Sequence, residues 1–151
     1  MLRRGASTRF AAQAGISVWR WSRGLARRLH GPQPGTSEPP LVFLVAGEPS
    51  SDAIGGKLMR ALRREHSGPL HFAGVGGPSM QAEGLHSLFP MEELSVMGFA
   101  EVLPRLLLLR SRLHQSLAAV RELRPSVVLG IDSKAFCLRL LRALADERRE
   151  K

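Results

Sequence analysis

The fold of the chain is decided by residues 41–55, LVFLVAGEPSSDAIG. The run Leu41 to Ala46 is continuously apolar, which is typical of a strand buried on both faces of a parallel sheet. Gly47 ends this run, and apolar residues then recur at steps of three and four, as they do in an amphipathic helix. A buried strand, a glycine turn and a helix begin an open α/β sheet, which binds ligands at the carboxyl ends of its strands. The turn after Ala46 is therefore the first candidate site.

The rest of the chain continues this alternation of strands and helices. Further strands are predicted at residues 70–75, 85–89 and 127–131. A short helix should begin at Pro78 and stop at Gly84, because proline suits a first helical turn and glycine ends a helix. A long helix should run from Pro104 to Pro125, and a last one from 136 to 149. The apolar stripe of the long helix is Leu106, Leu109, Leu113, Leu117 and Val120. Strands separated by helices imply parallel βαβ units, so the predicted fold class is α/β with a Rossmann-like parallel sheet.

Residues 1–40 have the composition of an organellar presequence followed by a linker. They hold seven arginines and a single acidic residue, Glu38. On a helix, Ala14, Val18, Trp21 and Leu25 would form an apolar stripe opposite arginines, which is typical of such presequences. The Pro/Gly-rich stretch at 31–40 cannot hold a helix and predicts a linker. Arginine density favours a mitochondrial address over a plastid one, and a tail without any import role is the alternative. The predicted domains are thus 1–40, presequence and linker, and 41–151, folded domain.

The charge of the chain does not indicate a nucleic-acid-binding protein. Its net charge is +9, but residues 41–151 hold fifteen basic and twelve acidic residues and lack Tyr and Trp, so no basic patch is interleaved with these aromatics. The histidines lack metal-ligand spacing, so no metal site is predicted. Glu92 and Glu93 are adjacent and do not converge, which predicts a solvated turn. Cys137 is the single cysteine and is predicted to be a small core residue.

The first glycine turn allows two interpretations. Gly47 permits a tight turn because it has no Cβ. Ser50, Ser51 and Asp52 are all residue types that cap the N-terminus of a helix. The same N-terminus could instead bind the phosphate of a ligand through its free N–H groups. The spacing matches neither a Walker loop nor GxGxxG, so the residues alone do not choose between capping and ligand binding.

Two further strand ends carry candidate residues. Gly74, Gly76 and Gly77 lie at the end of the second predicted strand, where they either allow a ligand to approach closely or make a sharp turn. Asp132 follows the strand at Val127 to Ile131. It is either a carboxylate that accepts a proton in the ligand crevice or the N-cap of the next helix.

The long helix carries more leucine than one buried stripe requires. The additional apolar residues are Val102, Leu103, Leu107 and Leu108, and they lie among Arg105, Arg110 and Arg112. A wide apolar face fringed by arginines suits a membrane interface. It also suits packing against a second domain, and burial within this domain is the third alternative.

Four segments, taken together, resemble the amino-terminal domain of the lipid-A-disaccharide synthase family. They are VAGEPSSD (45–52), GVGGPSMQAEG (74–84), MEELSVMGFAEVL (91–103) and GIDSKAF (130–136). Each segment alone is a modest signal, but all four occur in the family's order and span nearly everything after the linker. The resemblance implies that this α/β domain is the incomplete N-terminal half of a GT-B glycosyltransferase, which has two Rossmann-like domains.

The resemblance also implies a reaction and a set of site residues. The family joins UDP-2,3-diacylglucosamine to 2,3-diacylglucosamine 1-phosphate, giving the β-1,6-linked lipid A disaccharide and UDP, at a membrane surface and without a metal or cofactor. Asp132 corresponds to the candidate base that deprotonates the acceptor's 6-hydroxyl. The implied substrate-binding residues are Gly47, Glu48, Ser50, Asp52, Gly76, Gly77, Met97 and Gly98. The implied lipid contacts are Val102, Leu103, Leu106 and Leu107.

The chain also departs from the family pattern. Ser51 stands where G-E-x-S-G-D has its second glycine, and Ser133 to Cys137 is closer to plant organellar relatives than to bacterial ones. Judged against the family pattern, the sequence up to Lys151 is expected to lack both the strand that normally follows the GID helix and the UDP-sugar-binding carboxyl-terminal domain. We therefore expect a truncated mitochondrial homologue that is inactive alone and poorly stable, with the strand at 127–131 left as an open apolar edge. A non-catalytic lipid-binding or regulatory module is the alternative; the four ordered segments disfavour another nucleotide-sugar enzyme such as an epimerase.

Overall fold

The computed structural model describes residues 16–20, 39–94, 102–132 and 134–149. The strands are Ile16–Arg20 (β1), Leu41–Ala46 (β2), His71–Val75 (β3), His86–Ser87 (β4) and Val127–Ile131 (β5). The helices are Pro49–Glu65 (α3), Pro78–Ala82 (α4), Val102–Leu123 (α5) and Lys134–Arg149 (α6), with a 3-10 turn at Met91–Leu94 (η1). The predicted alternation of strands and helices is therefore confirmed from Leu41 onward.

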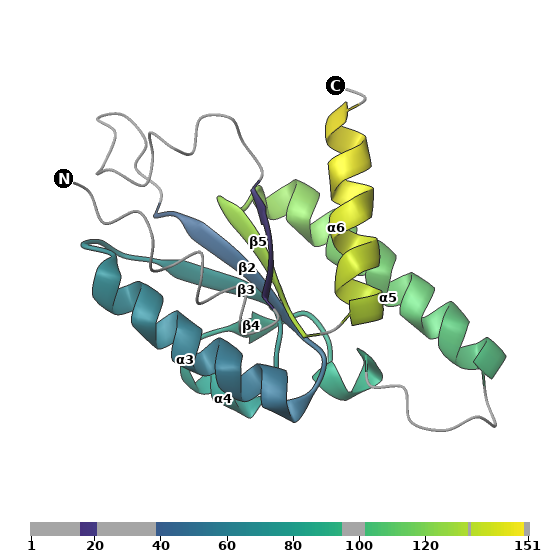
Figure 1. Cartoon of the computed structure of the whole chain (residues 1–151), viewed down its shortest axis with the longest axis horizontal. Helices are drawn as coiled ribbons and strands as arrows, with labels where there is room; N and C mark the ends of the chain where they lie inside the picture. Colours follow the sequence, from purple (N-terminus) through teal and green to yellow (C-terminus); the bar gives the residue numbers. More distant parts are fainter. Residues whose placement is uncertain (1–15, 21–38, 95–101, 133, 150–151) are drawn as a thin grey trace.

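The five strands form one sheet in the order β1-β5-β2-β3-β4. β2 pairs in parallel with β3 on one side and β5 on the other, and β3 pairs in parallel with β4. Figure 1 shows α3 and α4 on one side of this sheet and α5 and α6 on the other. Because helices cover both faces, Val42 to Ala46 are all buried. This is the predicted α/β, Rossmann-like parallel sheet.

The long helix differs from its prediction at its start. α5 begins at Val102, so that Pro104 lies within its first turn, where a missing N–H removes no intrahelical bond. The second half of α5 packs on the core, with Leu117 and Val120 buried. Leu106, by contrast, is 46% exposed, so its prediction as a core residue is wrong. Leu109 and Leu113 are partly buried and also pack against the core, so α5 contacts the core from Leu109 onward.

The segment Ile16–Arg20 is a β-strand, so the helical interpretation of this stretch is wrong. β1 pairs antiparallel with β5 over five residue pairs, from Ile16 opposite Ile131 to Arg20 opposite Val127. The edge of β5 that the sequence predicts to be open is consequently occupied by a strand of the same chain. The other residues of the proposed apolar stripe, Ala14, Trp21 and Leu25, lie outside the described residues.

Two glycines are needed for close packing between elements. Gly74 in β3 has φ +139°, and a Cβ there would lie 1.8 Å from the carbonyl oxygen of Leu44 in β2. Gly56 faces α4, where a Cβ would lie 2.9 Å from the carbonyl oxygen of Ser79. These glycines let β3 approach β2 and α3 approach α4, and neither role involves a ligand.

On the other side of the sheet, α5 and α6 are linked by the ion pair Arg121–Glu147. The hydrogen bond and the charge of Glu147 raise the pKa of Arg121 above its usual value. Cys137 on α6 is buried, as predicted for a core residue.

Candidate functional site

Three of the predicted site residues lie in one row at the carboxyl edge of the sheet. Ala46 at the end of β2 pairs with Ile131 at the end of β5, and Val45 pairs with Val75 in β3. The residues that follow these strand ends, Gly47, Gly76 and Asp132, therefore lie on adjacent strands, which are spaced by about 4.8 Å. The topology thus brings together segments that are up to 85 residues apart in the sequence, at the edge where such sheets bind ligands.

The first turn is closed by a backbone–hydroxyl pair. Glu48 is the N-cap of α3, and its N–H donates to Ser51 Oγ at 3.0 Å while this hydroxyl donates to the Glu48 carbonyl oxygen at 2.8 Å. Ser51 is fully buried, so the serine in place of the family's glycine fits the first turn of α3. Glu48 and Ser50 are exposed at this turn.

Asp52 caps a helix, but not the one that it was predicted to cap. Asp52 is 2% exposed, and its carboxylate accepts three backbone hydrogen bonds, from the N–H groups of Gly77 (2.9 Å), Ser79 (2.8 Å) and Met80 (3.0 Å). These groups form the N-terminus of α4, whereas Asp52 itself lies in the first turn of α3. The carboxylate therefore holds the first and second glycine turns together and occupies the N–H groups that an anionic ligand would otherwise use.

The glycines of the second turn are packed against their own chain. A Cβ on Gly77 would lie 2.8 Å from Asp52 Oδ2, and one on Gly76 would lie 2.8 Å from the Leu85 side chain. The Gly76 N–H donates to Ser87 Oγ at 3.2 Å. The contacts favour a structural use of both glycines, and their assignment to substrate binding stays a prediction.

Asp132 is the acidic residue in the row. It is exposed and has φ +50°, a left-handed conformation that is uncommon for residues other than glycine. Backbone conformations of this kind cost of order 1–3 kcal/mol and cluster at functional sites. The turn thus presents the Asp132 carboxylate at the carboxyl edge of the sheet, beside the turn at Gly47.

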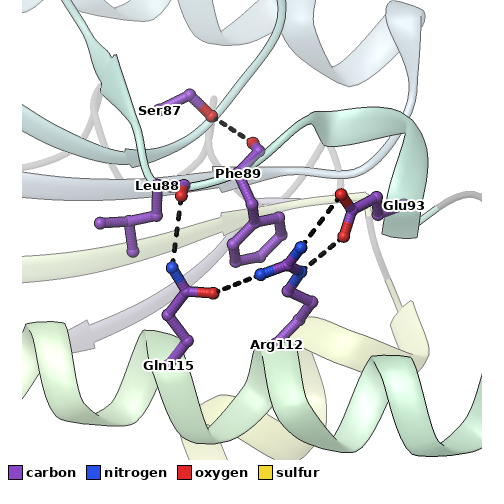
Figure 2. Close-up of polar contacts among 6 residues, drawn as sticks. All are labelled: Ser87, Leu88, Phe89, Glu93, Arg112 and Gln115. Atoms are coloured by element: carbon purple, nitrogen blue, oxygen red, sulfur yellow. Dashed lines mark hydrogen bonds and ion pairs between the residues drawn. The ribbon is translucent and has the colours of Figure 1, made fainter.

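Glu93, Arg112 and Gln115 form a hydrogen-bonded cluster, called the clamp below, beside the carboxyl edge of the sheet (Figure 2). Arg112 Nε and Nη2 donate to the two carboxylate oxygens of Glu93 at 2.5 and 3.1 Å, and Arg112 Nη1 donates to Gln115 Oε1. The Arg112 guanidinium also lies 5.0 Å from the ring centre of Phe89. The solvated turn predicted for Glu92 and Glu93 is thus confirmed at Glu92, which is exposed, and wrong at Glu93, which is paired and only partly exposed. The clamp could not be predicted from the sequence, because its residues lie in two separate elements, η1 and α5, and their spacing does not indicate that they pair.

The clamp is tied to the strand-end turns by further contacts. Ser87 Oγ, which accepts from the Gly76 N–H, donates to the Phe89 carbonyl oxygen at 2.7 Å. The ring of Phe89 packs in a T-shaped arrangement with the ring of Phe136, in the helix that follows Asp132, at 6.5 Å between centroids. Gln115 Nε2 donates to the Leu88 carbonyl oxygen at 3.3 Å. The segment 87–94 is therefore fastened to the second turn, α5 and α6 at once.

The leucine-rich surface is exposed where the structure describes it. The exposed fractions are 46% for Leu106, 64% for Leu107 and 38% for Leu108. Arg110 is exposed on the next turn. The side chains of Val102 and Leu103 lie outside the described part, as do Met97 and Gly98 altogether. The burial alternative is thus wrong for Leu106 to Leu108, and the membrane and second-domain alternatives remain.

Other features of the described residues do not contribute to the candidate site at the strand ends. A shallow surface hollow lies on the second half of α3, lined by Lys57, Arg60 and Arg64, away from the turn at which the helix begins. Among the described residues, no group of three His, Cys, Asp or Glu side chains could hold a metal ion. No helix in the described ranges is long and apolar enough to cross a membrane.

Comparison with known proteins gives a consistent result. The family model described as lipid-A-disaccharide synthetase matches residues 42–150. The chain is 54% identical to the lipid-A-disaccharide synthase of Rhodospirillum centenum over 103 residues, which is 68% of this chain and 26% of that protein. It is 48% identical to the probable mitochondrial lipid-A-disaccharide synthase of Arabidopsis thaliana over 103 residues, 68% of this chain and 22% of that protein. The chain thus spans about a quarter of the length of these relatives. Because the matched region is more than half of the chain and runs from Val42 in β2 to the end of α6, the chain belongs to the lipid-A-disaccharide synthase family.

Proposed function

We propose that this chain supplies the acceptor-binding part of a glycosyltransferase of lipid A biosynthesis. The donor is UDP-2,3-diacylglucosamine, the acceptor is 2,3-diacylglucosamine 1-phosphate, and the products are the β-1,6-linked disaccharide and UDP. Asp132 acts as the general base that takes the proton of the acceptor's 6-hydroxyl as that oxygen attacks the sugar carbon bonded to UDP. UDP leaves with the electrons of the bond that breaks.

The row of strand-end residues carries this proposal. The exposed Asp132 carboxylate neighbours the turn at Gly47, and the exposed side chains of Glu48 and Ser50 lie in that turn. Asp52, Gly76 and Gly77 shape the same edge through backbone contacts. Met97 and Gly98 are proposed as further substrate contacts by resemblance. By resemblance to the family, the proposed reaction uses neither a metal nor a cofactor.

The activity is tested with two polypeptides. One is the 151-residue chain, and the other is extended by the residues that its relatives carry beyond the matched region. We expect that only the extended polypeptide, and not the 151-residue chain, forms disaccharide from the two lipid substrates, because the proposed donor site belongs to the additional residues. Product from the 151-residue chain above a blank without enzyme would contradict this division of the site.

We further propose that the leucine-rich surface, comprising Val102, Leu103, Leu106 and Leu107, rests on a membrane. Fully burying a leucine contributes about 1.5–3 kcal/mol, so two half-exposed leucines account for at least about tenfold in binding. The double variant Leu106→Ser/Leu107→Ser of the full chain should therefore bind vesicles of phosphatidylcholine and anionic phosphatidylglycerol about tenfold more weakly. Leu138→Ser is the matched control, because Leu138 is 43% exposed on a different helix, α6. An equal loss of vesicle binding in the double variant and in Leu138→Ser would contradict the proposal that the leucine-rich surface is the membrane contact.

The same measurement addresses a second function, a lipid-binding or regulatory module without catalysis, which the exposed leucines also favour. Vesicle binding together with failure of the extended polypeptide to form product would support that module over the enzyme.

We propose that residues 1–40 direct the chain to mitochondria, with plastids as the alternative. The arginine-rich, acid-poor composition and the mitochondrial designation of the Arabidopsis relative support this address. A fluorescent protein fused after residue 40 is expected in mitochondria, whereas a fusion in which the seven arginines are replaced by glutamine should stay in the cytosol. Plastid or cytosolic fluorescence of the unmodified fusion would refute a mitochondrial address.

A further inference from the structure

The outer edge of β5 is covered by the amino-terminal segment of the same chain. Every residue of β5 from Val127 to Ile131 has a partner in β1, and the pairing is antiparallel. The opposite edge of β5 pairs in parallel with β2. Among the residues that the structure describes, β5 therefore has a strand on both sides only while Ile16–Arg20 is bound, and α6 also contacts β1.

Without β1, β5 would be an unusually unprotected edge. Its sequence is VVLGI, with no charged residue and no proline. Natural edge strands are normally blunted by charges, prolines, bulges or a covering element, because their free N–H and C=O groups pair with other chains. Among these devices, the described residues supply β5 with the covering element, β1. In this 151-residue chain, the described part of the structure therefore protects this edge with the five residues Ile16–Arg20.

We propose that Ile16–Arg20 is an intramolecular edge cap that prevents two copies of the chain from joining through β5. Two identical edge strands related by a two-fold axis pair antiparallel, which is the sense in which β5 already pairs with β1. The occupant of the free edge is thus the β5 strand of a second copy. Removal of residues 1–40 as a presequence would release the cap, but the inference itself depends neither on import nor on catalytic activity.

A proline scan of β1 in the full chain tests the cap. In an antiparallel pair, successive residues alternate between pointing their N–H at the partner strand and pointing it away. Val18→Pro should therefore differ from Ser17→Pro and Trp19→Pro, since proline is tolerated only where the N–H faces solvent. The disruptive substitutions should accelerate hydrogen exchange about tenfold at those amides of Val127–Ile131 that bond to β1. They should also raise the mass measured by light scattering from monomer to dimer.

Amides of Leu41–Ala46 in β2 serve as the internal reference, because their protection should persist when only the cap is released. Unchanged exchange in β5 for all three prolines would overturn the cap. Faster hydrogen exchange in β5 without formation of a dimer would contradict the proposal that the β5 strand of a second copy occupies the free edge. Equal effects of all three proline substitutions on exchange would also overturn the cap. In a β-strand the N–H groups alternate in direction, so neighbouring positions should respond differently.

A cross-link provides a test that does not rely on proline. Arg20 and Val127 are opposite each other, at a spacing that a disulfide can bridge. The variant Arg20→Cys/Val127→Cys, with Cys137→Ser to remove the native thiol, should oxidise within one chain and stay monomeric at high protein concentration. Failure to form this disulfide, or dimerisation of the oxidised protein, would overturn the proposal.

Discussion

Replacing Asp132 by asparagine is expected to lower turnover about 10²–10⁴-fold in the extended polypeptide, which is the range that general base catalysis contributes. Asparagine has nearly the size of aspartate and is also enriched in the left-handed conformation, so it should keep the backbone at φ +50°. The substitution removes the carboxylate that accepts the proton and leaves the turn in place. The rate of product formation at saturating concentrations of both lipids measures the effect, and the KM values should change little.

The matched control is Asp146→Asn, which removes an exposed carboxylate from α6. This variant should retain the turnover of the unmodified polypeptide, and both variants should unfold at the same temperature as it does. If Asp132→Asn kept near-normal turnover, the residue would be a turn residue between β5 and α6, and the base would have to be sought elsewhere along the carboxyl edge.

The strands that are buried on both faces could be predicted to the residue. Leu41–Ala46 and Val127–Ile131 are continuously apolar, bounded by Gly47 and Pro125, and α5 and β4 differed only at their ends. Local patterns suffice here because helices cover both faces of the parallel sheet, so that every residue of these strands is under the same constraint. The position of Gly47, Gly76 and Asp132 at one edge of the sheet follows from this topology.

Pairings between distant segments could not be predicted in this way. In Ile16–Arg20 the spacing of apolar residues and arginines favours a helix, but the strand forms because β5 offers an unpaired edge far along the chain. The adjacent Glu92 favours a solvated turn at Glu93, whereas the actual partner of Glu93 is Arg112 on α5. Residue type and spacing do not carry this information, because the partner is chosen by tertiary packing.

Asp52 is the site residue for which the structure changes the interpretation most. The sequence offered capping of α3 or binding of a ligand, and the carboxylate instead binds three N–H groups at the start of α4, 25 to 28 residues later. A buried carboxylate with three backbone donors is satisfied within the protein, so its first role is to fix the distance between the two glycine turns.

Replacing Asp52 by asparagine should therefore destabilise the 151-residue chain by about 2–5 kcal/mol. The amide can accept hydrogen bonds only through Oδ1, and its NH₂ group would face an N–H donor that the second carboxylate oxygen binds now. Each buried donor left without an acceptor costs about 1–3 kcal/mol, and the charge that strengthens the three bonds is lost as well. Urea unfolding, followed by circular dichroism, measures the free energy of unfolding.

Two controls separate this effect from a general loss of charge and from a role in ligand binding. Asp146→Asn removes the same charge from an exposed position and should change the free energy of unfolding by less than about 0.5 kcal/mol. Ser50→Ala alters an exposed residue of the first turn and should be equally mild. An Asp52→Asn protein as stable as these controls would show that the α4 N-terminus does not need the carboxylate. Asp52 would then again be a candidate for contact with substrate, because a buried charge that contributes nothing to folding is retained only where it serves binding or chemistry.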